Sequence, residues 1–245
     1  MRVSVRRLRA ILRAAGSMFA PKPIKALRDE LKWLGSMLGE PRDLDVLSAH
    51  LREELRQLEP QDRNAGRSLV RRLEKAGAKP RQELQAALDS PRYFALLDSV
   101  EDAISNPPVV DADVSLTDVA AGEWKKLRKT VKALPSEPAD AELHAVRIKA
   151  KHARYAGELA VSEQGHAVER FVDRVKKLQD ILGEHQDAAV AETRLRELAR
   201  DAPAPRTGFV AGLLVERQHA RRRAAREAFE EVWPEVERRG RKAWR

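Results

Sequence analysis

A long-range internal repeat limits the possible folds of this chain most strongly. The segment LKWLGSMLGEPRDLDV (31–46) aligns with VKKLQDILGEHQDAAV (175–190) at an offset of 144 residues. Upstream of these segments, RVSVRRLR (2–9) aligns with RIKAKHAR (147–154) at an offset of 145 residues. Solenoid repeats have periods of roughly 20–50 residues. The repeat therefore predicts two similar halves related by a pseudo-twofold axis, each with a cationic helix followed by a helix that closes in LGExxD.

Apolar residues recur at spacings of three and four along almost the whole chain, and no alternating run indicates a strand. We therefore predict an all-α protein of two four-helix-bundle-like halves, residues 1–104 and 117–245, joined by a linker at 105–116. Breaker residues predict that a first helix ends at Pro21 and Pro23 and that a second ends at GEPRD (39–43). Pro80 and Pro91 punctuate two more helices. The other expected helices span about 43–58, 60–77, 117–134, 139–162, 166–182, 185–200 and 208–232.

The composition favours an anionic partner. Lys and Arg number 47 against 38 Asp and Glu, which leaves a net charge of +9. The chain has no cysteine, so disulfides and cysteine-based metal sites are excluded. It has no apolar run of about 18 residues, and RVSVRRLR after Met1 does not resemble a signal-peptide core. We therefore expect a cytoplasmic protein that makes no membrane contact.

Each copy of the repeat carries a stripe of cations along one face of a helix. The stripes consist of Arg2, Arg6, Arg9 and Arg13 in the first copy, and of Arg147, Lys151 and Arg154, headed by His144, in the second. Like charges one turn apart repel by a few tenths of a kcal/mol, so two such stripes indicate a function. Arginine forks, lysine charges and protonated histidine suit an elongated phosphate polyanion. The alternative is a solvated face whose cations pair with acids on neighbouring helices.

These motifs resemble the CHAD family, the conserved histidine α-helical domain. The resemblance rests on LHAVRIKAKHARYAGEL (143–159) with LQDILGEHQDAAVA (178–191), on their echoes RVSVRRLRAILR (2–13) and LKWLGSMLGEPRDLDVL (31–47), and on the closing RKAWR (241–245). It implies a protein without catalysis or cofactor that binds inorganic polyphosphate in a basic groove between the halves. The implied phosphate contacts are Arg2, Arg6, Arg9, Lys32, His144, Arg147, Lys151, Arg154 and Lys176, with Arg7, Arg13, Arg42 and His152 as outer contributors to the same site.

The resemblance also implies association with polyphosphate granules and with a polyphosphate-metabolising enzyme. Nothing in the sequence resembles the triphosphate tunnel domain that often precedes a CHAD domain. The first-copy equivalent of His144 falls at position −1, two residues before Met1. We therefore expect the first copy to start late, without its histidine and without a preceding helix.

Two other functions stay open at this point. A protein of this charge binds nucleic acid non-specifically at low salt, although two symmetric stripes do not resemble a single recognition helix. The third class is a protein that docks to an acidic partner. No metal site is predicted, because the E-x-x-H spacings Glu163/His166 and Glu216/His219 have polar flanks.

Other polar and aromatic residues receive structural interpretations. His152 and His185 are interpreted as surface or capping histidines. Asp43 and Asp187 are interpreted as N-caps of a following helix or as partners of a cationic stripe. Trp33, Trp124, Trp233 and Trp244 are interpreted as core or interhelix anchors.

Overall fold

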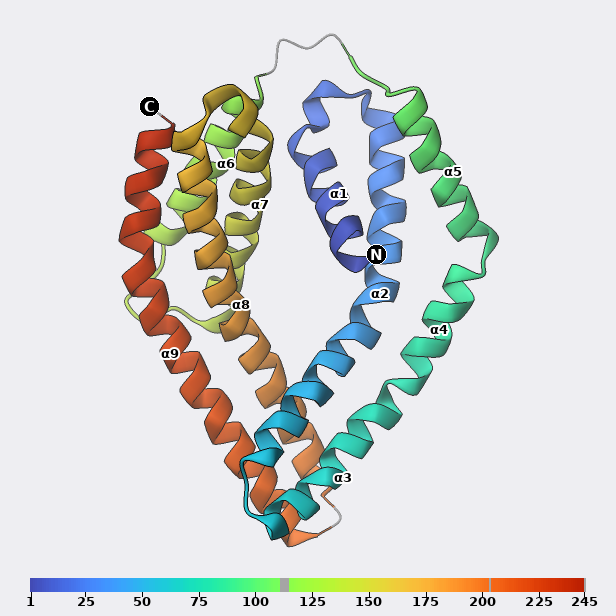
Figure 1. Ribbon diagram of the computed structural model, residues 1–245, viewed down its shortest axis with the longest axis vertical. Helices are drawn as coiled ribbons and strands as arrows, with labels where there is room; N and C mark the ends of the chain where they lie inside the picture. Colours follow the sequence, from blue (N-terminus) through green and yellow to red (C-terminus); the bar gives the residue numbers. More distant parts are fainter. Residues whose placement is uncertain (111–114, 203, 245) are drawn as a thin grey trace.

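The computed structural model describes residues 1–110, 115–202 and 204–244 (Figure 1). Its helices are α1 (Arg2–Ala14), α2 (Pro21–Arg56), α3 (Pro60–Ala76), α4 (Ala78–Leu88), α5 (Pro91–Ser105), α6 (Leu116–Lys132), α7 (Asp140–Gln164), α8 (His166–Arg200) and α9 (Pro205–Ala243), with one 3₁₀ turn at Gly16–Met18. The predicted all-α class is confirmed, since the described ranges hold only an isolated β-bridge between Phe19 and Val109. None of these helices combines the length and apolar character needed to cross a bilayer.

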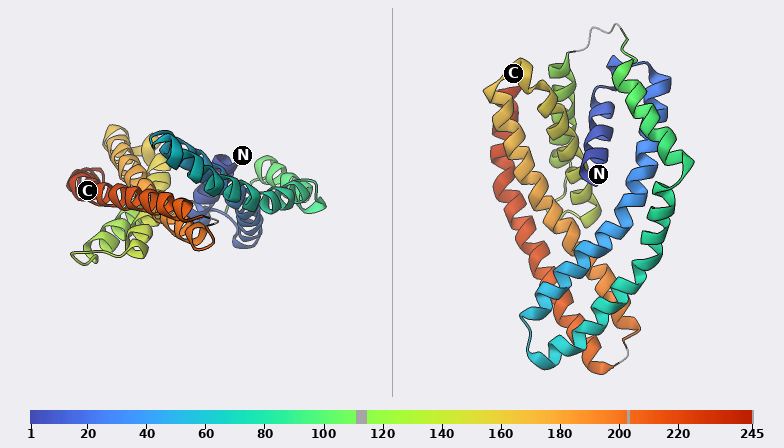
Figure 2. Two further views of the ribbon diagram at one scale, coloured as in Figure 1. Left: turned by 90° about the horizontal axis from the view of Figure 1, so that it is seen from below. Right: turned by 45° about the vertical axis from the view of Figure 1, so that its right-hand side comes forward.

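The helices form two arms that converge on a tip, as Figure 1 and Figure 2 show. One arm contains α6, α7 and the upper parts of α8 and α9. The other contains α1, the upper part of α2, α4 and α5. The lower parts of α2, α8 and α9 meet α3 at the tip. Most of the expected linker connects the arms at the opposite end, but its residues 111–114 lie outside the described residues.

Three apolar clusters hold this arrangement together. The α6–α9 arm has a core around Trp124, Phe171 and Leu178, and the other arm has one around Leu31 and Leu34. The tip core consists of Leu44, Leu47, Leu51, Leu55, Leu69, Val70, Leu73, Ala191, Leu195, Val210, Ala211 and Leu214. The tip core therefore joins residues 44–73 to residues 191–214. The division into residues 1–104 and 117–245, and the pseudo-twofold relation between them, stay predictions.

Two of the expected helix breaks are wrong. Helix α2 runs without interruption through GEPRD (39–43), with Pro41 buried inside it, and α8 runs past Gly183 to Arg200. An interior proline removes a backbone hydrogen bond and costs about 3 kcal/mol, which is why the local sequence predicts an end. The leucines that follow Pro41 belong to the tip core, and their burial outweighs this cost. For the same reason α9 continues past its expected end at 232 to Ala243, with Pro234 inside it.

Aromatic packing fixes the C-terminal helix to the α6–α9 arm. Trp124 contacts Phe171 and Trp233, and Trp244 contacts Phe171. The predicted anchoring role of these three tryptophans is confirmed. A Cβ atom at Gly240 would come within 2.5 Å of the Trp124 ring, so the absence of a side chain there allows α9 to approach α6.

The position of helix α1 brings the cationic residues of the two repeat copies together. It lies between α2 and α7, as both views show, and contacts both helices. Val5 and Leu12 pack into the apolar cluster with α2, while Ala14 joins the core of the other arm. The first cationic stripe is therefore brought against the second, although the two are more than a hundred residues apart in sequence.

A substitution at Gly39 tests whether α2 is one continuous helix. It lies in the helix interior, and nothing lies within 4 Å of where its Cβ would be. Interior glycine is less favourable than alanine by about 0.5–1 kcal/mol. We expect Gly39→Ala to raise the free energy of unfolding in urea by about that amount.

The control for this measurement is Gly165→Ala. Gly165 has φ 65° and ψ −147°, a conformation that suits only glycine, so this variant should lose stability. A loss of stability in Gly39→Ala would contradict an unbroken α2.

Candidate functional site

The cationic stripes of α1 and α7 lie against each other. Burial of Lys151 lowers the pKa of its ammonium group, and the nearby charge of Arg147 lowers it further. Arg6, Arg9 and Arg13 of α1 act on Lys151 in the same direction. Such Coulombic effects need short separations. The structure therefore brings cations predicted from both copies of the repeat into one cluster.

Part of the predicted set is paired with carboxylates. These ion pairs are Arg2–Asp43 (2.8 Å), Arg7–Glu158 (3.5 Å), Arg13–Glu123 (3.2 Å) and Arg154–Glu158 (2.9 Å). The remaining cations form no ion pair with any described residue; they are Arg6, Arg9, Lys32, Arg42, Arg147, Lys151 and Lys176. The alternative interpretation of the stripes, in which acids on neighbouring helices pair with the cations, therefore applies to only part of the set.

Helix α8 presents neutral groups to the stripe of α7. The Nδ1–H of His144 donates to Oε1 of Gln186 at 2.7 Å, because an amide oxygen can only accept. Arg154 reaches the amide oxygen of Gln179 at 3.5 Å. Gly183 lies between these two positions, and its Cβ position would be 3.9 Å from Nε of Arg147. The amides orient His144 and Arg154 without adding negative charge.

The aspartates of the two repeat copies are not helix caps, because α2 and α8 continue through them. The alternative interpretation, pairing with a cationic stripe, is confirmed for Asp43, which pairs with Arg2. Burial raises the pKa of Asp187, and Glu184 and Asp43 raise it further, while Arg147 opposes them. The Asp187 side chain nevertheless keeps contact with solvent.

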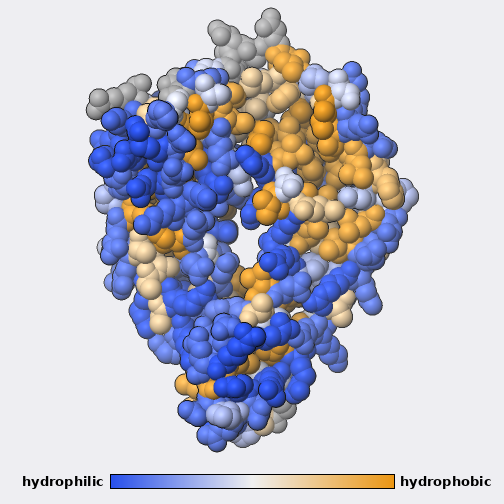
Figure 3. All heavy atoms as spheres, viewed as in Figure 1, coloured by the Kyte–Doolittle hydropathy of each residue, from blue (hydrophilic) through white to orange (hydrophobic). Residues whose placement is uncertain are grey.

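Figure 3 shows the space between the two arms. An opening passes between the two arms above the tip, and hydrophilic residues follow its left edge. The helices that contribute the predicted cations, α1, α2, α7 and α8, lie around the middle of the molecule between the arms (Figure 1). The cluster is therefore reachable by a ligand from solvent.

The interpretation of His152 and His185 as surface or capping histidines is wrong. The His152 side chain is 17% exposed and its Nδ1 lies 3.9 Å from Glu123. Burial, followed by the charge of Arg13, lowers the pKa of His152 to about 4. His185 is 1% exposed, and burial lowers its pKa as well. Neither imidazole is charged at neutral pH, so His152 adds no positive charge to the predicted site.

Sequence reasoning missed Glu123, the residue that positions α1. Its carboxylate is 8% exposed and binds Arg13 of α1 at 3.2 Å and Lys126 at 2.9 Å. Burial pushes the pKa of Glu123 upward, but the bonds to Lys126 and Arg13 outweigh burial and leave the pKa lowered. Arg13 therefore fastens α1 to α6. No local pattern in the sequence indicates this pair, because its two residues are 110 positions apart.

The described residues contain no group of three or more histidine or acidic side chains that could hold a metal ion. In the two E-x-x-H segments, His166 pairs with Glu169. His219 pairs with Glu192 and Glu216. His166 thus contacts one exposed carboxylate, and His219 lies between the buried Glu192 and the exposed Glu216.

The lowered pKa of His152 predicts a loss of stability in acid. The unfolded chain binds a proton near pH 6.5, whereas the folded protein takes it up only near pH 4, so stability falls as pH drops across this window. The expected loss is about 3 kcal/mol. In urea unfolding measured over this window, His152→Gln should show a shallower pH dependence than the wild type. Parallel pH profiles would contradict the buried, neutral state of His152.

The lowered pKa of Lys151 predicts that its charged form destabilises the folded protein. Its lowered pKa means that the folded state disfavours the charged form, and this penalty is present below the lowered pKa and disappears as pH rises toward the ordinary lysine range. We expect Lys151→Met to raise the melting temperature of the ligand-free protein at neutral pH. The difference from the wild type should shrink at alkaline pH, while Lys75→Met on the exposed face of α3 should change little. A lower melting temperature for Lys151→Met at neutral pH would contradict the crowding of like charges.

Comparisons with known proteins agree with this architecture. Residues 1–196 match the CHAD domain family. Two relatives from Mycobacterium tuberculosis, the uncharacterized protein MT2285 of strain CDC 1551 and the uncharacterized protein Rv2226 of strain H37Rv, are each 28% identical over 257 residues. These alignments cover 99% of this chain and 48% of each relative, so the chain spans about half the length of both.

Two solved structures have the same fold. PptA from Streptomyces chartreusis matches with a TM-score of 0.83 and 27% identity, over 95% of this chain and 87% of that one. The CHAD domain from the plant Ricinus communis matches with a TM-score of 0.71 and 30% identity, over 95% of this chain and 79% of that one. The family match covers most of the chain and the folds agree along its length, so this protein belongs to the CHAD domain family.

Proposed function

We propose that this protein binds inorganic polyphosphate, without catalysis, in a basic groove formed between its arms by α1, α2, α7 and α8. The observation that carries the proposal is the cluster of cations around Lys151, whose pKa is lowered by burial and further by the charges of Arg147 and of α1. Like charges held together without carboxylates repel each other. Bound phosphates would remove this repulsion. The polyphosphate binding that the CHAD resemblance implies supports the same ligand.

The spacing of the cations suits a polymer better than a single phosphate. The stripe from Arg2 to Arg13 extends about 16 Å at 1.5 Å per residue, and the stripe of α7 lies against it. A polyphosphate chain carries negative charge along its whole length, so several cations can bind it at once. The guanidinium forks of Arg6, Arg9 and Arg147 suit the phosphate oxygens.

Nucleic acid fits the cluster less well. Binding of single strands usually needs aromatic side chains on which bases stack. Trp124, Trp233 and Trp244 pack within the arm core or against it, and Trp33 is covered by the guanidinium of Arg92 at 4.3 Å. In this proposal nucleic acid binds only non-specifically. The protein acts in the cytoplasm, at polyphosphate granules or beside a polyphosphate-metabolising enzyme.

Charge reversal with matched spacing tests the proposal. Arg147→Glu with Lys151→Glu alters two cations one turn apart in the cluster, and Arg67→Glu with Arg71→Glu makes the same change on the exposed face of α3. We expect the first pair to weaken binding of long-chain polyphosphate by about 100-fold and to reduce its salt dependence, because fewer counterions are released. The second pair should have little effect. Equal losses would mean that only net charge matters.

Competition separates the ligand classes. At equal phosphate and moderate salt, long-chain polyphosphate should displace RNA from the protein, and RNA should fail to displace polyphosphate. Displacement of polyphosphate by RNA would replace the proposal with nucleic-acid binding. Binding of neither would favour docking to an acidic protein.

A further inference from the structure

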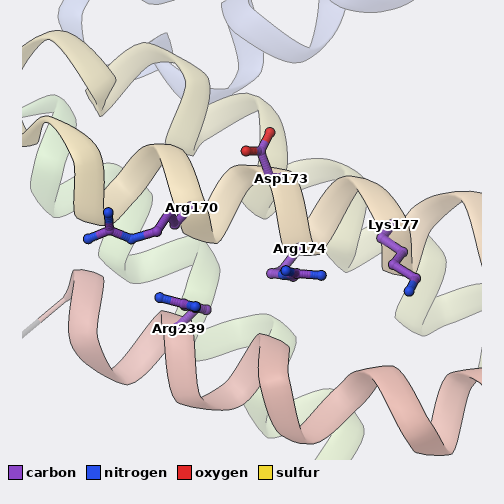
Figure 4. A pocket seen from close by; sticks show the side chains of 5 residues that line it. All are labelled: Arg170, Asp173, Arg174, Lys177 and Arg239. Carbon is purple, nitrogen blue, oxygen red and sulfur yellow. The ribbon is translucent and has the colours of Figure 1, made fainter.

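A second group of cations lies between α8 and α9, outside the central cluster. A depression of about 310 Å³ is lined by Arg170, Asp173, Arg174, Lys177 and Arg239. A neighbouring depression of about 340 Å³ is lined by Arg238, Arg239, Arg241 and Lys242. We call these residues, without Asp173, the outer patch. In Figure 4 Arg170, Arg174 and Lys177 lie on the side of α8 that faces α9, Arg239 extends from α9 toward α8, and Asp173 points to the other side of α8.

One carboxylate organises much of the outer patch. Glu235 of α9 pairs with Arg239 at 2.8 Å, with Arg238 at 2.5 Å and with Arg174 at 3.8 Å. The bonds from Arg239 and Arg238 lower the pKa of Glu235, so it stays ionised. A single negative charge cannot neutralise three guanidinium groups. Glu235 therefore holds them in place and leaves a positive surface.

The rest of the outer patch adds to this excess. Arg170, Lys177 and Lys242 form no ion pair with a carboxylate in the part of the chain that the structure describes. Arg241 shares Glu237 with Arg128. In Figure 3 the upper left of the molecule, over the upper ends of α8 and α9, is densely hydrophilic. Positive charge, two adjoining depressions and guanidinium groups fixed by Glu235 together suit an anionic ligand.

We propose that the outer patch is a second phosphate-binding site, which takes a segment of polyphosphate outside the central groove. The identity of the ligand rests on the proposed function. The choice of a phosphate chain over nucleic acid rests on the aromatics near the patch. Trp233 and Trp244 of the C-terminal region contact Trp124 and Phe171, so bases would find no stacking surface here.

The two sites lie on adjacent faces of one helix. Lys176 belongs to the predicted central set and Lys177 to the outer patch, and successive helical residues point about 100° apart. A long polyphosphate chain that leaves the groove beside Lys176 therefore meets Lys177 on the next face. A protein with both sites binds a long chain at more points than the groove alone provides, or binds two chains at once.

Lysine footprinting tests the proposal, with long-chain polyphosphate as the probe and mass spectrometry of lysine acylation as the readout. Lys177 and Lys242 report on the outer patch, and Lys32 reports on the groove. Arg170→Glu with Arg174→Glu removes two exposed cations one turn apart and leaves the reporter lysines in place. Arg67→Glu with Arg71→Glu is the matched control, and Arg147→Glu with Lys151→Glu disables the groove.

We expect polyphosphate to protect Lys177 and Lys242 even in the groove variant. In the outer variant, about tenfold more polyphosphate should be needed to protect Lys177, whereas protection of Lys32 should match that in the control variant. Protection of Lys32 without protection of Lys177 would overturn the outer site and leave the proposed function standing. Protection of Lys177 without Lys32 would contradict the groove and support the outer patch. No protection at either position would overturn both.

An RNA arm at equal phosphate separates the two polymers at the outer patch. Stronger protection of Lys177 by polyphosphate than by RNA supports the proposal. Protection by RNA and not by polyphosphate would make the outer patch a nucleic-acid surface and overturn it.

Discussion

The position of the cationic cluster depends on the buried carboxylate of Glu123, which pairs with Arg13 of α1. Through Arg13 it fastens α1 to the α6–α9 arm, and this contact places Arg6 and Arg9 beside Lys151 despite their mutual repulsion. Loss of Glu123 would leave Arg13 half-buried without a counter-charge, a costly state, and α1 would then keep its apolar contacts and the more exposed ion pairs of Arg2 and Arg7. The arrangement of the cationic cluster thus depends on an acidic residue of α6.

Stability and binding make opposite demands on this protein. The three apolar clusters and the ion pairs of Arg2, Arg13 and Arg154 stabilise the fold, whereas the unpaired cations on α1 and α7 work against it. Helix α8 shows how the conflict is limited. It supplies Gln179 and Gln186 where acidic residues would form stronger bonds but cancel the charge. The cluster is therefore ordered and still positive.

Much of the fold and part of the site were predictable from the sequence, because they depend on local patterns. Helical periodicity predicts the all-α class, and the repeat predicts which cations form stripes. The breaks at Pro41 and Gly183 were wrong because the burial that keeps α2 and α8 continuous comes from a core shared with distant helices. The burial of His152 and His185 and the role of Glu123 also depend on contacts between helices. The outer patch was missed for the same reason, since Arg239 reaches Arg170 and Arg174 only when α9 packs on α8.

The continuous helices α2 and α8 couple the separation of the arms to the packing at the tip. Helix α8 has 35 residues, a length of about 52 Å, and α2 has 36. Both run from the tip into opposite arms, so the angle at which each helix leaves the tip core decides where its far end lies. A change of about 5° in this angle shifts the far end of a helix of this length by about 4–5 Å. The tip core that holds Leu51, Leu195 and Leu214, together with the Arg13–Glu123 pair, therefore sets the separation of the two arms.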